Sequence, residues 1–401
     1  MEIMPATSGY RTYIAIAGRR NVGKSSLINA IVNQEIALVS NVAGTTTDPV
    51  YKSMELQPIG PVTLIDTPGI DDEGELGKKR IERAKRAFYK ADVGVLVVDS
   101  EPNGFEHSIC DLFEKMNIPF IIVLNKIDQL NNVSNLKQLY INSFGRPVLE
   151  VSCKEKINIE RVKEALTELK PKEEEIPLLP QFIKSNDIVL LVVPVDTGAP
   201  KGRLIMPQVA TIREAIDRKA FPIVTSVEGI SEIISKLKEK PKLVITDSQA
   251  IGRVSELVSE DINLTTFSIL EAHHKGDISI LTKDIDVINN LENGDTILIM
   301  EGCSHRPLSE DIGRVKIPKW LEKYSEKSLN FKFIAGKEFP DIEDVKNVKL
   351  VVHCGGCTLT RRMMLRRINS INRLGVPVVN YGVLISFLHG SLNRTLEPLS
   401  L

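Results

Sequence analysis

Short apolar runs alternate with polar, helix-like segments along most of the chain. In the first 170 residues the apolar runs are Tyr13–Ala17, Tyr51–Leu56, Val62–Ile65, Ala91–Asp99, Phe120–Leu124 and Val148–Val151. Runs of this length are typical of strands buried on both faces of a sheet. Between them come segments such as Ser26–Ile31, which we expect to be helical. The pattern predicts an α/β fold for this part.

The alternation continues, with shorter spacing, over the rest of the chain. Further strands are predicted at Ile188–Val193, Phe221–Val224, Lys242–Thr246, Ile278–Leu281, Thr296–Met300 and Val348–Val352, and helices at Val209–Lys219, Ile230–Glu239 and Thr360–Ile371. A chain of 401 residues is too long for one compact core. We therefore expect three domains: residues 1–170, 186–264 and 265–401, with a linker at 171–185 that is rich in proline and charge.

A glycine-rich turn follows the first predicted strand and precedes the first helix. It reads Gly18-Arg19-Arg20-Asn21-Val22-Gly23-Lys24-Ser25, with Ser26 next, and matches the phosphate-binding pattern G-x-x-x-x-G-K-[ST]. Its backbone N–H groups and the helix N-terminus would surround an anion. Lys24 would reach the β- and γ-phosphates, and Ser25 would hold Mg2+.

Four more polar loops fit the same site. In the loop 41–48, Thr46 is the expected second Mg2+ ligand, with Thr45 or Thr47 as alternatives. The strand before Asp66-Thr67-Pro68-Gly69 brings Asp66 near the metal and the N–H of Gly69 near the γ-phosphate. Two base-contacting loops follow later strands, and their expected nucleotide-binding residues are Asn125, Lys126, Asp128, Ser152, Cys153 and Lys154.

The first of these two base-contacting loops is predicted to select guanine. The Asp128 carboxylate can accept from N1–H and the 2-amino group of guanine, which adenine cannot supply. Together the five loops resemble the small G-protein domain of the translation-factor-related class, most closely bacterial GTPases with a G-T-T-x-D first switch. The resemblance implies GTP binding and a doubly wound, mostly parallel sheet with its ligand at the carboxyl ends of the strands.

Two positions bear on hydrolysis. Ile70 stands where many G proteins carry a water-orienting glutamine, so we expect slow hydrolysis, with Lys24 and Thr46 as the catalytic residues. Asn21 and the 44–48 loop resemble GTPases that bind K+ near the phosphates, so Asn21 is the candidate K+ ligand.

Three of the five cysteines lie late in the chain, directly after predicted strands. The segment Glu301-Gly302-Cys303-Ser304-His305 follows one strand, and His353-Cys354-Gly355-Gly356-Cys357 follows another. Parallel strands would bring Cys303, Cys354 and Cys357 to one edge, with glycines that let the backbone approach. Three cysteines and a histidine suit tetrahedral zinc, whereas three cysteines with one open corner suit an iron–sulfur cluster. Ligand type alone leaves both metals open.

The order of a GTPase domain, a small α/β domain and a C-x-H…H-C-x-x-C domain resembles the FeFe-hydrogenase maturation GTPases of the HydF family, over essentially the whole chain. The resemblance implies a 4Fe–4S cluster on Cys303, Cys354 and Cys357, with His305 as a weak fourth ligand or a neighbour, and His353 orienting the loop. It implies a homodimer through the middle domain. It also implies a scaffold that carries a di-iron precursor to apo FeFe-hydrogenase and works with two radical-SAM maturases.

Composition narrows the alternatives. Net charge is −1 and aromatic content is 5%, which argues against a general nucleic-acid or membrane binder. No apolar run approaches the roughly 20 residues that span a bilayer, and there is no signal-peptide pattern, so a cytoplasmic protein is expected. The alternative function is a zinc-stabilised GTPase acting in tRNA modification or ribosome assembly.

Overall fold

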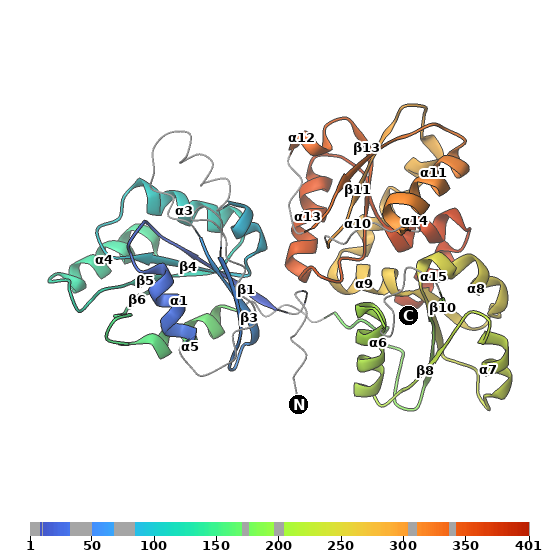
Figure 1. Cartoon of the computed structure of the whole chain (residues 1–401), viewed down its shortest axis with the longest axis horizontal. Coiled ribbons are helices and arrows are strands. Elements are labelled where there is room, and N and C mark those ends of the chain that lie inside the picture. The colour runs from blue at the N-terminus through green and yellow to red at the C-terminus, as the bar shows by residue number, and fades with distance from the viewer. Residues whose placement is uncertain are drawn as a thin grey trace. The chain divides into compact units, whose positions relative to one another are not determined.

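The computed structural model describes residue 9 and residues 11–32, 50–67, 85–170, 176–195, 204–303, 311–336 and 342–400. The chain divides into two compact units, Met1–Glu173 and Glu174–Leu401. Figure 1 shows an α/β arrangement in both units. None of the described helices is long and apolar enough to cross a membrane.

The first unit is built on a six-stranded sheet of order β2-β3-β1-β4-β5-β6. Only β2 runs antiparallel to its neighbour among these described strands, and the others form parallel pairs. The strands are β1 Thr12–Ala17, β2 Val50–Leu56, β3 Gly60–Asp66, β4 Val93–Val98, β5 Phe120–Leu124 and β6 Val148–Glu150. The mostly parallel sheet expected from the sequence is confirmed.

Helices cover both faces of this sheet, because alternate residues of each central strand point to opposite sides. Ile14 and Ile16 of β1 pack in one apolar cluster with α1 and α5, while Ala15 and Ala17 pack in another with α3 and α4. Figure 1 shows α1 and α5 across the sheet from α3. These helices are α1 Lys24–Val32, α3 Gly104–Lys115, α4 Val133–Phe144 and α5 Ile159–Leu169.

The second unit contains two four-stranded parallel sheets. The first has the order β10-β9-β7-β8 and the second the order β12-β11-β13-β14. The strands are β7 Ile188–Val192, β8 Phe221–Thr225, β9 Leu243–Thr246, β10 Asn263–Thr266, β11 Thr296–Met300, β12 Asn330–Ile334, β13 Val348–His353 and β14 Val378–Asn380. The helices are α6 Met206–Asp217, α7 Ile230–Lys236, α8 Ile251–Leu257, α9 Phe267–Lys275, α10 Ile278–Lys283, α11 Ile317–Ser325, α12 Ile342–Val345, α13 Arg361–Arg373, α14 Tyr381–Leu388 and α15 Leu392–Leu396.

One continuous apolar cluster joins these two sheets. It includes Leu190 and Val244 from the first sheet and Ile297 and Val352 from the second. At the end of the chain, the hydroxyl of Thr265 on β10 donates to the carbonyl of Thr395 on α15. The C-terminal helix therefore packs on the sheet that begins the unit.

The segment Ile278–Leu281 is a helix, and the strand predicted there is wrong. Asp277 precedes α10, and its carboxylate accepts from the N–H groups of Ser279 and Ile280. This is the bonding of an N-cap residue, which starts a helix. A four-residue apolar run fits a strand and a buried helical turn equally well, and here the cap decides.

Two local features of the structure lie at the domain boundaries that the sequence predicts. The boundary between residues 264 and 265 falls inside β10, which pairs with β9 through Thr266. In the expected linker, the described residues 176–185 form no helix or strand, but Leu178, Leu179 and Ile183 are buried in the core of the second unit. The chain is therefore anchored to this unit before β7 begins.

Candidate functional site

The polar loops predicted to bind a nucleotide follow β1, β3, β5 and β6. Within the sheet, Ile16 of β1 is in register with Asp66 of β3, and Leu124 of β5 with Glu150 of β6. Parallel strands present their carboxyl ends at one edge, so these loops share that edge.

The phosphate-binding loop needs its glycines. Gly18 and Gly23 have φ angles of +153° and +96°. A Cβ on Gly18 would lie 2.4 Å from the carbonyl oxygen of Val97, and one on Gly23 would lie 2.2 Å from Nδ2 of Asn125. Asn21 also adopts a left-handed conformation, with φ of 61°, which asparagine tolerates better than most residues.

The structure brings two predicted Mg2+-site residues together. Lys24 begins α1 and is buried, with Nζ donating to the carbonyls of Gly18 at 2.9 Å and Arg19 at 2.7 Å. The next residue, Ser25, donates from Oγ to Oδ2 of Asp66 at 2.5 Å. A hydroxyl and a carboxylate in direct contact offer the oxygen ligands that Mg2+ prefers. Ser26 is exposed on the same turn.

Several residues of the predicted nucleotide site lie outside the described part of the chain. These are Thr46 with its alternatives Thr45 and Thr47, and also Gly69 and Ile70. The side chain of Asn21, the candidate K+ ligand, is exposed at the loop.

The side-chain amide of Asn125 connects the loops that are predicted to bind the nucleotide. Nδ2 of Asn125 donates to the carbonyl of Val22 at 2.9 Å, and its Oδ1 accepts from the N–H of Cys153 at 3.2 Å. Lys126 pairs with Asp99 at 2.6 Å. Sequence reasoning did not assign Asp99, although it directly follows β4 at this sheet edge.

The carboxylate that is predicted to select guanine, that of Asp128, is oriented by the next loop. Asp128 is exposed, and Oδ1 accepts from the hydroxyl of buried Ser152 at 2.6 Å. This hydrogen bond is the main cause that lowers the pKa of Asp128. The lowered pKa keeps the carboxylate ionised and able to accept hydrogen bonds. Lys154 is exposed beside these residues and pairs weakly with Glu155 at 3.7 Å.

The three late cysteines lie around the carboxyl ends of β11 and β13. Met300 and His353, the last residues of these strands, are in register. The N–H of Cys354 donates to the carbonyl of Met300 at 2.9 Å, and Sγ of Cys354 accepts from the N–H of Gly302 at 3.0 Å. Gly302 in turn accepts from the hydroxyl of Thr358 at 2.8 Å. These contacts hold the Cys303 loop against the Cys354–Cys357 loop.

Burial and the mutual proximity of the thiols raise the pKa values of the cysteines. Burial, followed by the neighbouring Cys354, raises the pKa of Cys303 to about 11 and that of Cys357 to about 12. Metal binding would have to displace these protons. Among the described residues, no three His, Cys, Asp or Glu side chains are placed to hold one metal ion. His305 lies outside the described ranges.

His353 is fully buried behind these cysteines. Its Nδ1 is 2.7 Å from the carbonyl of Cys354, so this nitrogen carries the proton and donates. Burial and then the charge of Arg367 lower its pKa to about 3, which keeps the ring neutral. The bond fits the expectation that His353 orients the loop.

Three charged residues near the cysteines were not predicted. Glu271 and Lys275 of α9 form a buried pair at 3.3 Å, and Nζ of Lys275 donates to the carbonyl of Cys357 at 3.0 Å. Arg367 of α13 is completely buried. The feature of the sequence that could have indicated its burial is helical periodicity, because Met363, Met364 and Ile371 place Arg367 on the apolar face of the helix.

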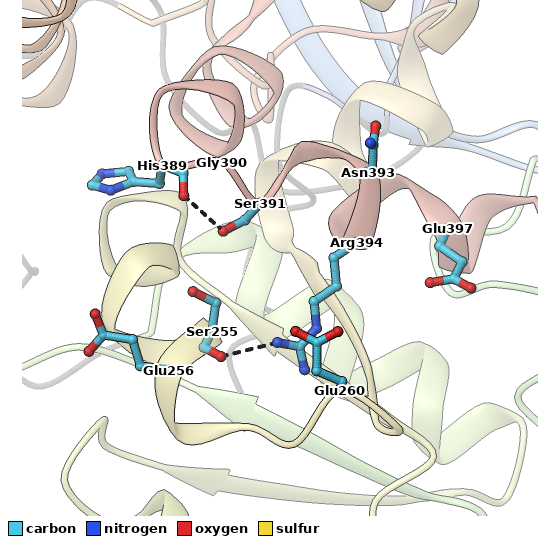
Figure 2. Close-up of a pocket in the computed structure, with 9 residues that line it drawn as sticks. All are labelled: Ser255, Glu256, Glu260, His389, Gly390, Ser391, Asn393, Arg394 and Glu397. Atoms are coloured by element: carbon cyan, nitrogen blue, oxygen red, sulfur yellow. Dashed lines mark hydrogen bonds between the residues drawn. The ribbon is translucent and has the colours of Figure 1, made fainter.

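A pocket of about 730 Å³ lies elsewhere on the second unit, and none of the predicted site residues lines it. Figure 2 shows Arg394 reaching across it to Ser255. The Arg394 guanidinium also donates to the carbonyls of Val258 and Ser259. These bonds tie α15 to the end of α8, so we assign Arg394 a structural role.

The fold and the first site define a GTPase domain, and comparison with known proteins agrees. Residues 13–126 match the family model described as 50S ribosome-binding GTPase. Over 132 residues the chain is 42% identical to GTPase Der of Wolinella succinogenes, covering 32% of this chain and 27% of that protein. Over 162 residues it is 32% identical to GTPase Era of Heliobacterium modesticaldum, covering 38% of this chain and 53% of that protein.

These relatives are matched over about half their length or less. A crystal structure of Aquifex aeolicus Era bound to GDP.AlF4- aligns with 53% of this chain and 92% of that chain, at 20% identity and a TM-score of 0.35.

Residues 178–276 match the hydrogen maturase F dimerization domain, and residues 279–398 match the hydrogen maturase F tetramerization domain. The chain belongs to the hydrogen maturase F family.

Proposed function

We propose that this protein is a GTP-binding scaffold that carries a di-iron precursor to apo FeFe-hydrogenase. The observation that carries the proposal is the meeting of Cys303 and Cys354 at one sheet edge, within a region that matches a hydrogen maturase F domain. Thiolates at this edge are suited to soft metals. Two radical-SAM maturases would be its other partners, as the sequence resemblance implies.

The nucleotide site would bind GTP with Mg2+ and hydrolyse it slowly. Lys24 would exchange its loop carbonyls for phosphate oxygens, while Ser25 and Asp66 would hold Mg2+ directly or through water. Thr46 would complete the metal site, and Asn21 would hold K+. A cation at that point would stabilise charge that develops during phosphoryl transfer.

The cysteines would hold a 4Fe–4S cluster. Cys303, Cys354 and Cys357 supply the thiolate ligands that such clusters use, and each thiolate binds its own iron, so they need not converge on one point. Such a cluster supplies one-electron chemistry and an iron atom without a thiolate, for which His305 is the candidate ligand. The five cysteines are thiols rather than disulfides, which fits a reducing cytoplasm.

Self-association would use the edge of the first sheet in the second unit. Strand β8 pairs only with β7 among the described strands, and Phe221 and Val224 on it are 53% and 45% exposed. On α6, beside β8, Val209 and Ile216 are exposed as well. An apolar sheet edge next to an apolar helix face is a surface that a second copy can cover. Residues 186–264, with β10 included through Thr266, would act as this dimerisation module.

The alternative is a zinc-stabilised GTPase that acts in tRNA modification or ribosome assembly. Its support comes from Der, Era and other GTPases that match the N-terminal part, whereas the maturase domain models match residues 178–398. Metal analysis separates the two functions.

The test is iron, acid-labile sulfide and zinc measured on protein purified without oxygen. We expect iron and sulfide in near-equal amounts and activation of apo FeFe-hydrogenase by protein loaded with the precursor. Stoichiometric zinc without sulfide would contradict the cluster and the maturation role together. Replacing His305 should change the spectrum of the cluster and leave its iron content.

A further inference from the structure

Arg367 is a buried guanidinium with unused donors. It is the largest fully buried side chain in the described part of the chain, and Nη1 donates to the carbonyl of Gly336 at 3.2 Å. Its Nε and Nη2 have no hydrogen-bond partner there. No ion pair to a carboxylate is found for it among the described residues.

Such an arrangement is costly for the protein alone. A buried charge without a counter-charge loses its hydration, and the single hydrogen bond to Gly336 replaces only part of it. Arginine stays protonated at neutral pH even though burial lowers the pKa of Arg367 to about 10. Two nitrogens of this planar group, Nε and Nη2, are therefore open to an acceptor that the described residues do not provide.

The neighbours of Arg367 indicate which acceptor this is. Arg367 acts electrostatically on Cys354 and on His353, so it lies at the carboxyl end of β13. The ring of His353 is neutral and offers no counter-charge. The groups that become negative at this edge are the cysteine thiolates and a metal centre bound to them.

We propose that Arg367 is the buried counter-charge and two-point hydrogen-bond donor of an anionic metal centre held by Cys354 and its two partner cysteines. This inference rests on the proposed cluster. The donor would retain the centre and raise its reduction potential, because positive charge and hydrogen bonds to sulfur favour the reduced, more negative form. Arg367 is a positioning residue, since the cysteines make the bonds to metal.

A purely structural role, fastening α13 to Gly336, predicts a different result. If Arg367 served only the fold, its loss would destabilise the protein with or without metal. A counter-charge is needed only when the metal centre is present, and its replacement by an apolar side chain of similar length is neutral or stabilising without it.

The test compares Arg367→Met, Arg367→Lys and the wild type in the full-length chain, with Arg373→Met as control. Arg373 is exposed at the end of the same helix. Each protein is loaded with iron and sulfide without oxygen. Thermal unfolding with and without metal, the rate of iron loss to a chelator and the reduction potential are measured.

For Arg367→Met we expect an unchanged or higher melting temperature without metal, a lower reduction potential, and iron loss about tenfold faster or more. Arg367→Lys keeps the charge without the fork and should keep a reduction potential nearer to the wild type. Arg373→Met should match the wild type throughout.

Two results would overturn the inference while leaving the cluster in place. One is a wild-type potential and iron-loss rate in Arg367→Met. The other is an equal fall in melting temperature with and without metal. If the wild type itself takes up no iron and sulfide, the proposed function fails first, and the inference fails with it.

Discussion

At Asp128 a single oxygen atom joins the two base-contacting loops. Oδ1 accepts from the Ser152 hydroxyl, and the carboxylate remains exposed toward the nucleotide edge. Asp128→Asn replaces an acceptor with a donor that faces the N–H groups of guanine, whereas the 2-oxo group of xanthine accepts from it. We expect GTP affinity to fall about 100-fold or more and preference to shift to xanthine nucleotides, measured by competition with a fluorescent nucleotide.

Ser152→Ala is the matched control for Asp128. It removes the hydrogen bond that orients the carboxylate and lowers its pKa, but it leaves both acceptor oxygens in place. Weaker GTP binding without any gain for xanthine nucleotides is the expected result. Unchanged GTP affinity in Asp128→Asn would contradict the assignment of guanine recognition to this residue.

Asn21 allows a clean test of the K+ site. Its φ of 61° suits asparagine or glycine, so Asn21→Gly permits the same backbone conformation and removes the side chain together with its oxygen. We expect wild-type GTP hydrolysis to be faster in K+ than in Na+ at equal ionic strength, and this difference to vanish in Asn21→Gly. Lys24→Ala serves as the low-activity reference for GTP hydrolysis, because loss of the ammonium group that contacts the phosphates should lower turnover about 100-fold or more.

Equal rates of the wild type in K+ and Na+ would remove Asn21 from this role. A K+ effect that persists in Asn21→Gly would place the ion against other groups.

The residues of the nucleotide site could be predicted because each has a fixed place in a short motif. Gly18, Lys24 and Asn125 each follow a strand at a set distance, and the fold brings them together. Arg367 and Asp99 could not be assigned this way. Their partners are remote in sequence. In the segment Arg361-Arg362-Met363-Met364-Leu365-Arg366-Arg367, periodicity places Arg367 on the apolar face, but only the packing shows that it is fully buried while the other three arginines are partly buried.

At the scale of elements, all described strands inside the sheets were predicted, whereas three of the edge strands were missed and three (β2, β6 and β8) were predicted. Strands β5 and β11 lie inside their sheets and are nearly continuous apolar runs. The missed strands are short or exposed: β10 and β14 have four and three residues, and β12 alternates at a sheet edge. Their pairing with a neighbour, rather than their own composition, makes them strands.

Strand β8 gives the prediction at this scale. Val224→Lys places a charge on the exposed face of this edge strand, where pairing with a second copy would bury it. We expect the full-length protein to sediment with a smaller mass than the wild type at the same concentration. Ile157→Lys in the first unit is the control, because Ile157 is similarly exposed at 42% and lies outside both maturase domain matches.

A variant Val224→Lys with the wild-type mass and an unchanged melting temperature would place the interface elsewhere on the chain. The two maturase domain matches leave room for more than one interface, so loss of one should yield a defined smaller species rather than a mixture.

At the scale of the whole molecule, each apolar cluster of the described residues lies within one unit. The clusters under the nucleotide site contain residues only up to Leu169, and the clusters of the second unit begin at Leu178. Separate cores imply that damage in one unit need not spread to the other.

Replacing Cys303, Cys354 or Cys357 singly with serine should therefore remove most of the iron and sulfide and abolish hydrogenase activation. GTP hydrolysis should stay within about twofold of the wild type, because the cysteines and the nucleotide loops belong to separate compact units. Iron and sulfide content and phosphate release, measured on the same preparation, test both halves. Cys110→Ser is the control, since that thiol is buried in the first unit. Loss of hydrolysis in the cysteine variants would show that the units depend on each other.

The amide of Asn125 has a consequence for how this site can change. It bonds the phosphate-binding loop through Val22 and the second base loop through Cys153, while its own loop carries Asp128. Because these hydrogen bonds hold the three loops together, a change in one loop alone would not alter the distance between the sites for the base and the phosphates. A nucleotide with a longer or shorter spacing between these ends would be rejected, whatever its base. Exchanging one of these loops for the loop of another protein would remove hydrogen bonds that Asn125 makes to its neighbours. We therefore expect that such a site can be transferred to another protein only as a whole domain.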